Sequence, residues 1–261
     1  MPRLAPRWPQ KPPAGTPIDW SSDLAVGLVA LVPLWEGAGL PVEIVSGVRA
    51  TSLGGAVWQP GPQGPQLYAG GNKTVTIQTP SLASNWTGPM SIACYAAPTA
   101  ASGGQQNLVG GYSFYLGWNR NGTADFEAGY GAFPVVAAGV VDGLPHVWGA
   151  TLPPSPQGGG SALYRDGVPL STTGGGSAAN APFWIGNLGV VGSLGWAAIW
   201  NRALSAGEHA AIAANFGALF APPGLALAEM LAPGGVGVYP PTRPRGAALK
   251  WPATRAFRAR F

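Results

Sequence analysis

The stretch Gly195-Trp196-Ala197-Ala198-Ile199-Trp200-Asn201-Arg202-Ala203-Leu204-Ser205 decides how this chain folds. Its first half is apolar and aromatic and ends at a polar pair, which predicts a β-strand over 194–201. Ser205 and Glu208 then have the spacing of a capping box, in which the serine caps a backbone N–H and the glutamate reaches back. Alanines 210, 211, 213 and 214, with an apolar stripe of Ile212, Phe216 and Leu219, predict a short helix that docks onto the strands and stops at Pro222.

Upstream of this stretch, short β-rich runs alternate with turn signals, which is typical of a sandwich or barrel. The expected strands are 28–35, 56–58, 67–68, 74–79, 90–96, 107–109, 113–118, 124–130, 135–141, 146–152, 162–165, 168–170 and 183–186. Asn121-Gly122 and Asp166-Gly167 are hairpin turn signals, because both positions tolerate a positive φ. No strand–helix alternation occurs, so the pattern disfavours a doubly wound fold and predicts an antiparallel two-sheet sandwich.

Residues 143–212 resemble the C-terminal half of a laminin-G-like, concanavalin A-like jelly roll. Three further motifs carry the resemblance: Gly143-Leu144-Pro145-His146-Val147-Trp148, Leu163-Tyr164-Arg165-Asp166-Gly167 and Phe183-Trp184-Ile185-Gly186. The opening run 27–39 is similar to the first strand of that family. The resemblance implies an all-β jelly-roll sandwich over 24–220 with one short C-terminal helix, and Trp148 and Tyr164 filling the space between its sheets. It implies little about a ligand.

Charge and proline separate two arms from this body. The chain has 261 residues, 41 Gly, 28 Pro and a net charge of +4. Residues 1–17 carry +3 and residues 221–261 carry +5, which leaves the part between them at −4. Proline fixes φ and removes a donor, so we expect extended arms over 1–23 and 221–261. Ordering such arms costs roughly 1–2 kcal/mol per residue, which predicts that neighbouring subunits pin them.

The arms mix arginine with aromatic residues, as protein interfaces do, while their charge density is low for single-stranded nucleic acid. We therefore predict that a protein partner contacts Arg3, Arg7, Trp8, Lys11, Arg243, Arg245, Lys250, Trp251, Arg255, Phe257, Arg258, Arg260 and Phe261.

The flanks also resemble those of jelly-roll proteins in tailed-bacteriophage virions, through Thr16-Pro17-Ile18-Asp19-Trp20 and the run 216–223. This resemblance implies a non-enzymatic virion structural protein, with capsid decoration or cementing expected first and tail or fibre attachment second. Its partners would be the major capsid protein or tail proteins and copies of itself, with glycans as further ligands. A stand-alone carbohydrate-binding module is the competing hypothesis, and a glycosidase is the third.

Residues for catalysis, metals or cofactors are sparse, so we expect none of these. Asp125 and Glu127 alone approach the paired acids of a glycosidase, and we interpret them as a solvated strand edge. His146 and His209 lack a nucleophile beside them and are expected to be structural, and the single Cys94 is expected in the core. Asp142 and Asp166 are assigned to turns rather than to calcium. Trp86, Trp118 and Tyr130 could stack on sugars or fill the core. No apolar run approaches the ~20 residues that span a membrane.

Overall fold

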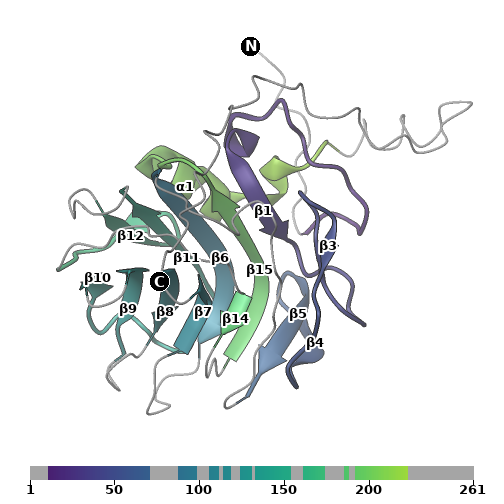
Figure 1. Cartoon of the computed structure of the whole chain (residues 1–261), viewed down its shortest axis with the longest axis horizontal. Helices are drawn as coiled ribbons and strands as arrows, with labels where there is room; N and C mark the ends of the chain where they lie inside the picture. The colour runs from purple at the N-terminus through teal and green to yellow at the C-terminus, as the bar shows by residue number, and fades with distance from the viewer. Residues whose placement is uncertain are drawn as a thin grey trace, which may run out of the picture. The chain divides into compact units, whose positions relative to one another are not determined.

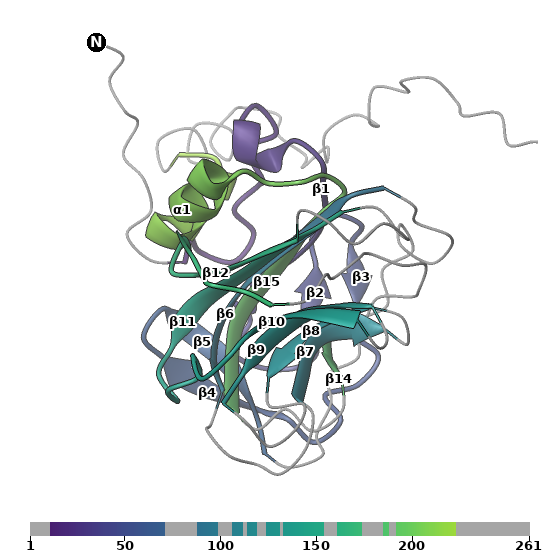
Figure 2. The same cartoon turned by 90° about the vertical axis from the view of Figure 1, so that its left-hand side faces the viewer.

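The computed structural model describes residues 11–70, 88–98, 106–111, 114–118, 124–130, 133–153, 161–173, 185–187 and 192–222. These residues form two large antiparallel sheets that face each other and one separate two-stranded sheet (Figures 1 and 2). The larger sheet runs in the order β13 (Val168–Pro169), β12 (Ala162–Arg165), β11 (His146–Leu152), β6 (Met90–Pro98), β15 (Gly192–Trp200), β5 (Gly64–Ala69) and β4 (Val57–Gly61), with β1 (Leu28–Val32) also paired to β15. The smaller sheet runs β10 (Phe133–Ala137), β9 (Phe126–Tyr130), β8 (Phe114–Trp118), β7 (Gln106–Gly111) and β14 (Ile185–Asn187).

Strand alternation explains why the larger sheet carries two cores. Along β6, Ile92 and Cys94 point into the core between the sheets, while Ala93 and Tyr95 join a second core on the opposite face. Successive side chains of a strand point to opposite faces, so a strand that is apolar throughout must be covered twice. Cys94 is fully buried in the inter-sheet core, and the expectation for it is confirmed.

The second core is covered by the elements at both ends of the described chain. The 3-10 helices η1 (Asp23–Ala25) and η3 (Phe216–Leu219) and the helix α1 (Ala206–Ala214) contribute to it. Figure 2 shows α1 lying on the side of β11 and β12 that faces away from the smaller sheet. Trp196 stacks on Phe216 with ring centroids 4.2 Å apart, which joins the deciding strand to the segment after the helix.

Gly195 lets β15 change register where it passes β6. The pairing shifts between Leu194 and Trp196, and a Cβ on Gly195 would lie 2.5 Å from Cδ1 of Tyr95. A bulge at this point turns Leu194 toward the inter-sheet core and Trp196 toward the second core, although they are two residues apart.

The structure confirms an all-β antiparallel two-sheet sandwich with one short C-terminal helix. The strand over 146–152 has the predicted bounds, whereas the expected strand over 74–79 lies outside the described residues. Two short strands, β2 (Val42–Glu43) and β3 (Val48–Arg49), were not predicted, because two-residue strands carry no alternation. The helix ends at Ala214, well before Pro222, and Phe216 and Leu219 belong to η3.

Tyr164 was expected between the sheets and instead lies on the other face of β12. Its ring stacks on His209 of α1 at a centroid distance of 4.0 Å, while its neighbour Leu163 points into the inter-sheet core. Trp148, by contrast, is fully buried between the sheets as predicted.

Candidate functional site

Only one of the predicted partner-binding residues, Lys11, lies within the described part of the chain. Outside it lie Arg3, Arg7, Trp8, Arg243, Arg245, Lys250, Trp251, Arg255, Phe257, Arg258, Arg260 and Phe261. The arms 1–23 and 221–261 are therefore described only over 11–23 and 221–222, and their predicted partner contacts stay predictions.

The ammonium group of Lys11 is bound by its own chain. Its Nζ donates hydrogen bonds to the carbonyl oxygens of Leu34, at 2.9 Å, and Pro65, at 2.5 Å. Burial lowers the pKa of Lys11 to about 7, although the charge of Glu36 acts in the opposite direction. A group so placed holds residue 11 against the body.

The rest of segment 11–23 also contacts the body. Ile18 forms an antiparallel bridge with Phe220, and the N–H of Asp19 donates to the carbonyl of Leu219 at 2.9 Å. The N–H of Ala221 donates to the carbonyl of Pro17 at 3.0 Å, so the segments 17–19 and 219–221 lie side by side. The expected clasp by foreign subunits is thus not needed for residues 11–23, because intramolecular bonds and burial of Ile18 order them.

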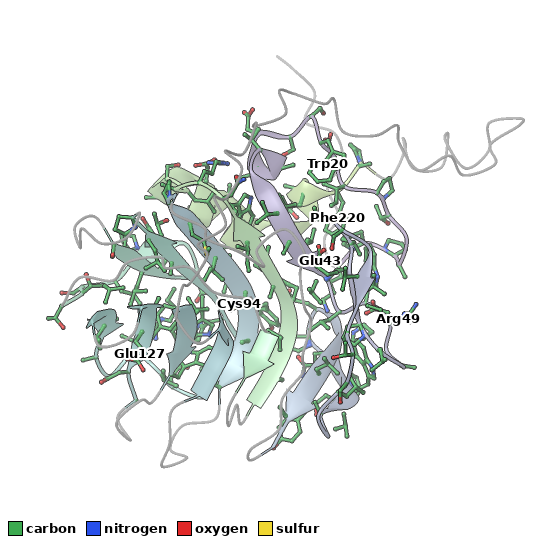
Figure 3. All side chains as sticks on the ribbon, viewed as in Figure 1. Trp20, Glu43, Arg49, Cys94, Glu127 and Phe220 are labelled. Atoms are coloured by element: carbon green, nitrogen blue, oxygen red, sulfur yellow. The ribbon has the colours of Figure 1, made fainter. Side chains whose placement is uncertain are left out.

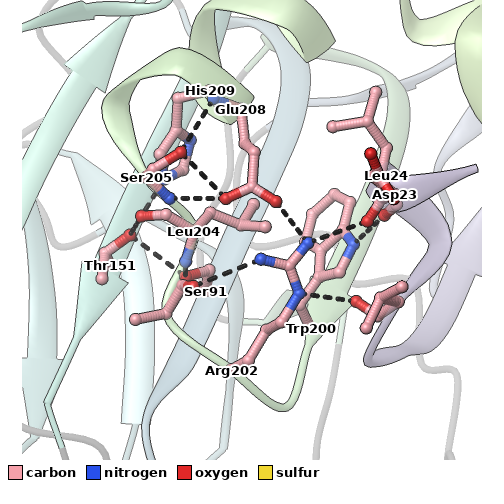
Figure 4. A network of polar contacts seen from close by, with 12 residues as sticks. Asp23, Leu24, Ser91, Thr151, Trp200, Arg202, Leu204, Ser205, Glu208 and His209 are labelled. Atoms are coloured by element: carbon pink, nitrogen blue, oxygen red, sulfur yellow. Dashed lines mark hydrogen bonds and ion pairs between the residues drawn. The ribbon is translucent and has the colours of Figure 1, made fainter.

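A polar network beneath α1 contains residue types that act in catalysis elsewhere (Figure 4). The hydroxyl of Thr151 donates to the carbonyl of Leu204 at 3.1 Å, and it lies 3.0 Å from both Ser91 Oγ and His209 Nε2. The only hydroxyl hydrogen of Thr151 is donated to the carbonyl of Leu204, so Thr151 Oγ1 must accept a hydrogen bond from His209 Nε2. Burial lowers the pKa of His209 to about 4 against the opposing charge of Glu208, so the ring is neutral at pH 7.

This network is structural. Ser91 is 0% and His209 2% exposed, so no substrate reaches either side chain in this conformation. The N–H of Leu204 donates to Ser91 Oγ at 2.8 Å, which fixes the turn between β15 and α1. The assignment of His209 to a structural role agrees with this geometry.

Arg202 and Glu208 complete the deciding motif by joining the helix to η1. Arg202 Nη2 lies 2.5 Å from Glu208 Oε1 and also donates to the carbonyl of Asp23 at 3.1 Å. The hydrogen bond from Arg202, with those from Ser205, lowers the pKa of Glu208 to about 2 although burial opposes it. Both bonds of the predicted capping box are present at Ser205.

A second group of charges lies where the turns beside β11 and β12 meet. His146 Nδ1 is 2.6 Å from Asp166 Oδ2, and His146 Nε2 is 3.0 Å from Asp142 Oδ2. Partial burial acts against ionisation, but bonds from the Leu144 N–H and from His146 lower the pKa of Asp142. Asp166 has φ 52° in the tight turn before Gly167, as its turn assignment predicts. Across the described ranges, no three metal-type ligands gather into a site.

Glu127 is not the solvated edge residue that the sequence suggested. It is 3% exposed on β9, which lies between β8 and β10, so that interpretation is wrong. Asp125 precedes the strand, and its Oδ1 accepts the N–H of Gly139 at 2.9 Å. The two acids therefore do not form an open pair on one strand face.

The aromatic residues proposed for sugar stacking do not provide a surface. Trp118 is 0% exposed and packs edge-on against Trp148 in the inter-sheet core. Trp86 and the side chain of Tyr130 lie outside the described residues. Among the described side chains, the exposed aromatics are Trp20, at 52%, and Tyr68, at 36%.

Tyr68 belongs to a row of side chains that crosses the larger sheet on its outer face. Val57 on β4 pairs with Tyr68 on β5, Tyr68 pairs with Ser193 on β15, and Ser193 pairs with Ala97 on β6. Directly paired residues of antiparallel strands lie on the same face, so these four side chains line up across the strands. We call this row, Val57, Tyr68, Ser193 and Ala97, the tyrosine row.

The tyrosine row is accessible to solvent, and the opposite face of strands β4 and β5 packs in the inter-sheet core. Leu67 and Ala69, the neighbours of Tyr68, point into the inter-sheet core, and no residue of β4 or β5 belongs to the second core. Val57 is 55% exposed, and Ser193 and Ala97 are half-buried. Gln59 and Gln66, paired across β4 and β5, lie two residues farther along the same face.

The Tyr68 ring is supported by Gly70. A Cβ built on Gly70 would lie 3.5 Å from Cε1 of the ring and 3.8 Å from its hydroxyl. The ring therefore lies close to the backbone and keeps an apolar surface available. The sequence signal for this site was the alternation in Gln66-Leu67-Tyr68-Ala69, which places Tyr68 on the face opposite Leu67.

Comparison with known proteins identifies similar folds but no family. No family model matches the sequence, and no curated protein matches it significantly. Among solved structures, the binding domain of Paraclostridial Mosquitocidal Protein 1 superposes with a TM-score of 0.57 and 13% identity, over 73% of this chain and 52% of that one. A Trypanosoma rangeli sialidase complex gives 0.54 and 14% over 76% and 36%.

Domain 4 of AbnA, a GH43 extracellular arabinanase of Geobacillus stearothermophilus solved with arabinotriose, gives a TM-score of 0.52 and 14% identity, over 71% of this chain and 98% of that domain. At these identities the likeness shows a β-sandwich fold. The chain spans about half of the first of these structures and about a third of the second. None of the structures named here is a phage protein.

Proposed function

We propose that this β-sandwich binds carbohydrate through the tyrosine row. The observation that carries the proposal is the exposed Tyr68 ring on a sheet face, within a row of uncharged side chains. An aromatic ring offers a large apolar surface at a low cost in conformational entropy, and its hydroxyl bonds to polar groups at its edge. A sugar ring has a matching construction, with C–H groups on its faces and hydroxyls around its rim.

Two further features support a binding role. Amide side chains both donate and accept hydrogen bonds, and Gln59 lies beside the row where a sugar hydroxyl would reach it. The similar solved structures include one titled as a binding domain and one domain in complex with arabinotriose. We propose the same class of ligand for this chain.

We also propose that the domain is not an enzyme. A glycosidase of the usual kind needs two accessible carboxylates across one bond, roughly 5–10 Å apart. In the described part of β9 and its flanks, Glu127 is buried and Asp125 is bonded to the backbone of Gly139.

The test is retention of the full chain in native gels that contain a panel of soluble polysaccharides, repeated with variants. Tyr68→Ala should abolish retention, and Tyr68→Phe should preserve most of it because the ring remains. Trp20→Ala is the matched control, since Trp20 is also an exposed aromatic but lies on the segment before η1. Retention that persists in Tyr68→Ala, or is lost in Trp20→Ala alone, would refute the proposed site.

The virion hypothesis, including decoration, tail attachment and location in the particle, rests on the basic arms and on the resemblance of the flanks. It does not conflict with glycan binding, because its predicted contacts lie mostly outside the described residues. Its test is removal of residues 224–261, which should abolish association with particles and leave the sandwich folded. Unchanged association of that truncation would overturn it.

A further inference from the structure

We infer, building on the proposed function, that the ligand of the tyrosine row is an uncharged glycan chain that lies extended across strands β4, β5, β15 and β6. The first argument concerns charge. The four strands read VWQPG, GPQLYA, GSLGWAAIW and MSIACYAAP, and none of their residues is Asp, Glu, Lys, Arg or His. The face that carries the tyrosine row therefore holds no charged side chain on these four strands.

An acidic sugar would be poorly recognised on such a face. Transfer of a carboxylate from water to a protein surface requires a cation or several donors in compensation. One described cation, Lys11, lies beside the turn between β4 and β5, with its Cδ 3.9 Å from a Cβ built on Gly64. Its ammonium group already donates to Leu34 and Pro65, so it is not available to a ligand. Neutral hydroxyls, in contrast, match the amide of Gln59 and the hydroxyl of Ser193.

The second argument concerns length. The tyrosine row spans three strand spacings of about 4.8 Å, or about 14 Å from Val57 to Ala97. One sugar ring covers Tyr68 and leaves the remainder of the row empty. Ser193 and Ala97 are small, so they leave room above the sheet beside the tyrosine ring. The row therefore fits several consecutive sugar units, with one of them on the ring.

The third argument concerns openness. Val57 at the start of the row is 55% exposed, and no residue of β4 or β5 belongs to the second core, although Trp196 of that core donates through Nε1 to Gln63 Oε1, in the turn between these strands, at 3.2 Å. A surface that is open at the Val57 end admits the middle of a chain, whereas a closed pocket would select a chain end. We therefore expect internal segments of a polysaccharide to bind.

The experiment is titration calorimetry of the full chain with matched probes. The neutral probes are xylo-, arabino-, cello- and laminari-oligosaccharides of one to six units, and the anionic probes are oligogalacturonates, hyaluronan oligosaccharides and sialyllactose. We expect a neutral series to bind, with affinity rising at least about tenfold from one unit to three or four and then levelling off. Val57→Ala should weaken the longer ligands several-fold, while Val168→Ala, an equally exposed valine on the other edge strand β13, should leave them unchanged.

Each outcome decides between the two proposals. Binding of anionic probes alone, with loss in Tyr68→Ala, would overturn this inference and leave the proposed function intact. A single sugar unit binding as tightly as longer chains would also overturn it. Binding of none of the probes, or binding that is equal in Tyr68→Ala and the wild type, would overturn both. Thermal melting of each variant, together with Tyr68→Phe, shows whether a loss reflects the missing contact or a misfolded chain.

Discussion

Acid should destabilise this protein through His209, and replacing that residue should remove the effect. The ring is 2% exposed beneath α1, and burial lowers its pKa from 6.5 to about 4. The unfolded chain therefore binds more protons than the folded chain between these two values. Folding stability is highest above pH 6.5 and falls as the pH decreases toward 4.

The size of the effect follows from the shift. Each pKa unit corresponds to about 1.4 kcal/mol, so the folded state should lose about 2–3 kcal/mol between pH 7 and pH 4.5 from His209 alone. That is a large part of the 5–15 kcal/mol by which typical domains are stable. Glu208 titrates lower, since its pKa is about 2 in the folded chain, and contributes mainly below pH 4.5.

The assay is urea unfolding of the wild type and His209→Gln at pH 7 and pH 4.5. Glutamine retains an N–H that can donate to Thr151 but does not titrate, so the variant should be less stable at pH 7 and lose less on acidification. Other titrating groups, such as Asp142, are present in both proteins, so their contributions to the loss of stability cancel when the two proteins are compared. An equal loss in both proteins would refute the reasoning, because it would mean that His209 is not protonated on unfolding.

Two further substitutions test other contacts of the fold. Gly167→Ala should lower the free energy of unfolding in urea by more than Gly139→Ala does. Both glycines have a positive φ, but a Cβ at residue 167 would lie 2.5 Å from Cα of Ala210, whereas a Cβ at residue 139 would have no atom within 4 Å. Each substitution carries the cost of roughly 1–2 kcal/mol for a left-handed backbone conformation. Equal losses of stability in the two variants would therefore mean that α1 does not pack closely against the turn at Gly167. The pKa of Lys11 is about 7 in the folded chain and 10.5 in the unfolded chain, so the unfolded chain binds more protons between these values. The free energy of unfolding of the wild type should therefore rise from pH 7 to pH 9, and Lys11→Met should not show this rise. The same rise in Lys11→Met would contradict burial of that amine.

The sequence predicted the sandwich because its strands carry their own signals. The run over 146–152 is mostly apolar, Asp166-Gly167 supplies a tight turn, and Ser205 with Glu208 caps the helix, and each of these signals lies within a few residues of sequence. The second core could not be predicted from such local patterns. The apolar run of β6 shows that both faces are covered but does not say by what, and the cover comes from η1 and η3, about 190 residues apart in the chain.

The candidate site was missed for a related reason. The predicted binding residues were the charged and aromatic residues of the arms. Tyr68 lies in a short strand to which the sequence analysis assigned no functional role. Its partners Val57 and Ser193 are 11 and 125 residues away, and only the strand register brings them into one row. Figure 3 shows the exposed Trp20 and the acid Glu127, which the sequence analysis considered for catalysis, on opposite sides of the view. Glu127 was wrongly assigned to an exposed edge because the residues next to it in the sequence do not indicate that its carboxylate is buried.

In the part of the chain that the structure describes, no helix is both long and apolar enough to cross a bilayer. The most direct measurement is nuclear magnetic resonance of the labelled protein during titration with the neutral oligosaccharides. The amide signals of Val57, Tyr68 and Ser193 should shift together and saturate at one ligand per chain. Shifts confined to residues around Trp20 or around Glu127, with the tyrosine row unmoved, would contradict the account.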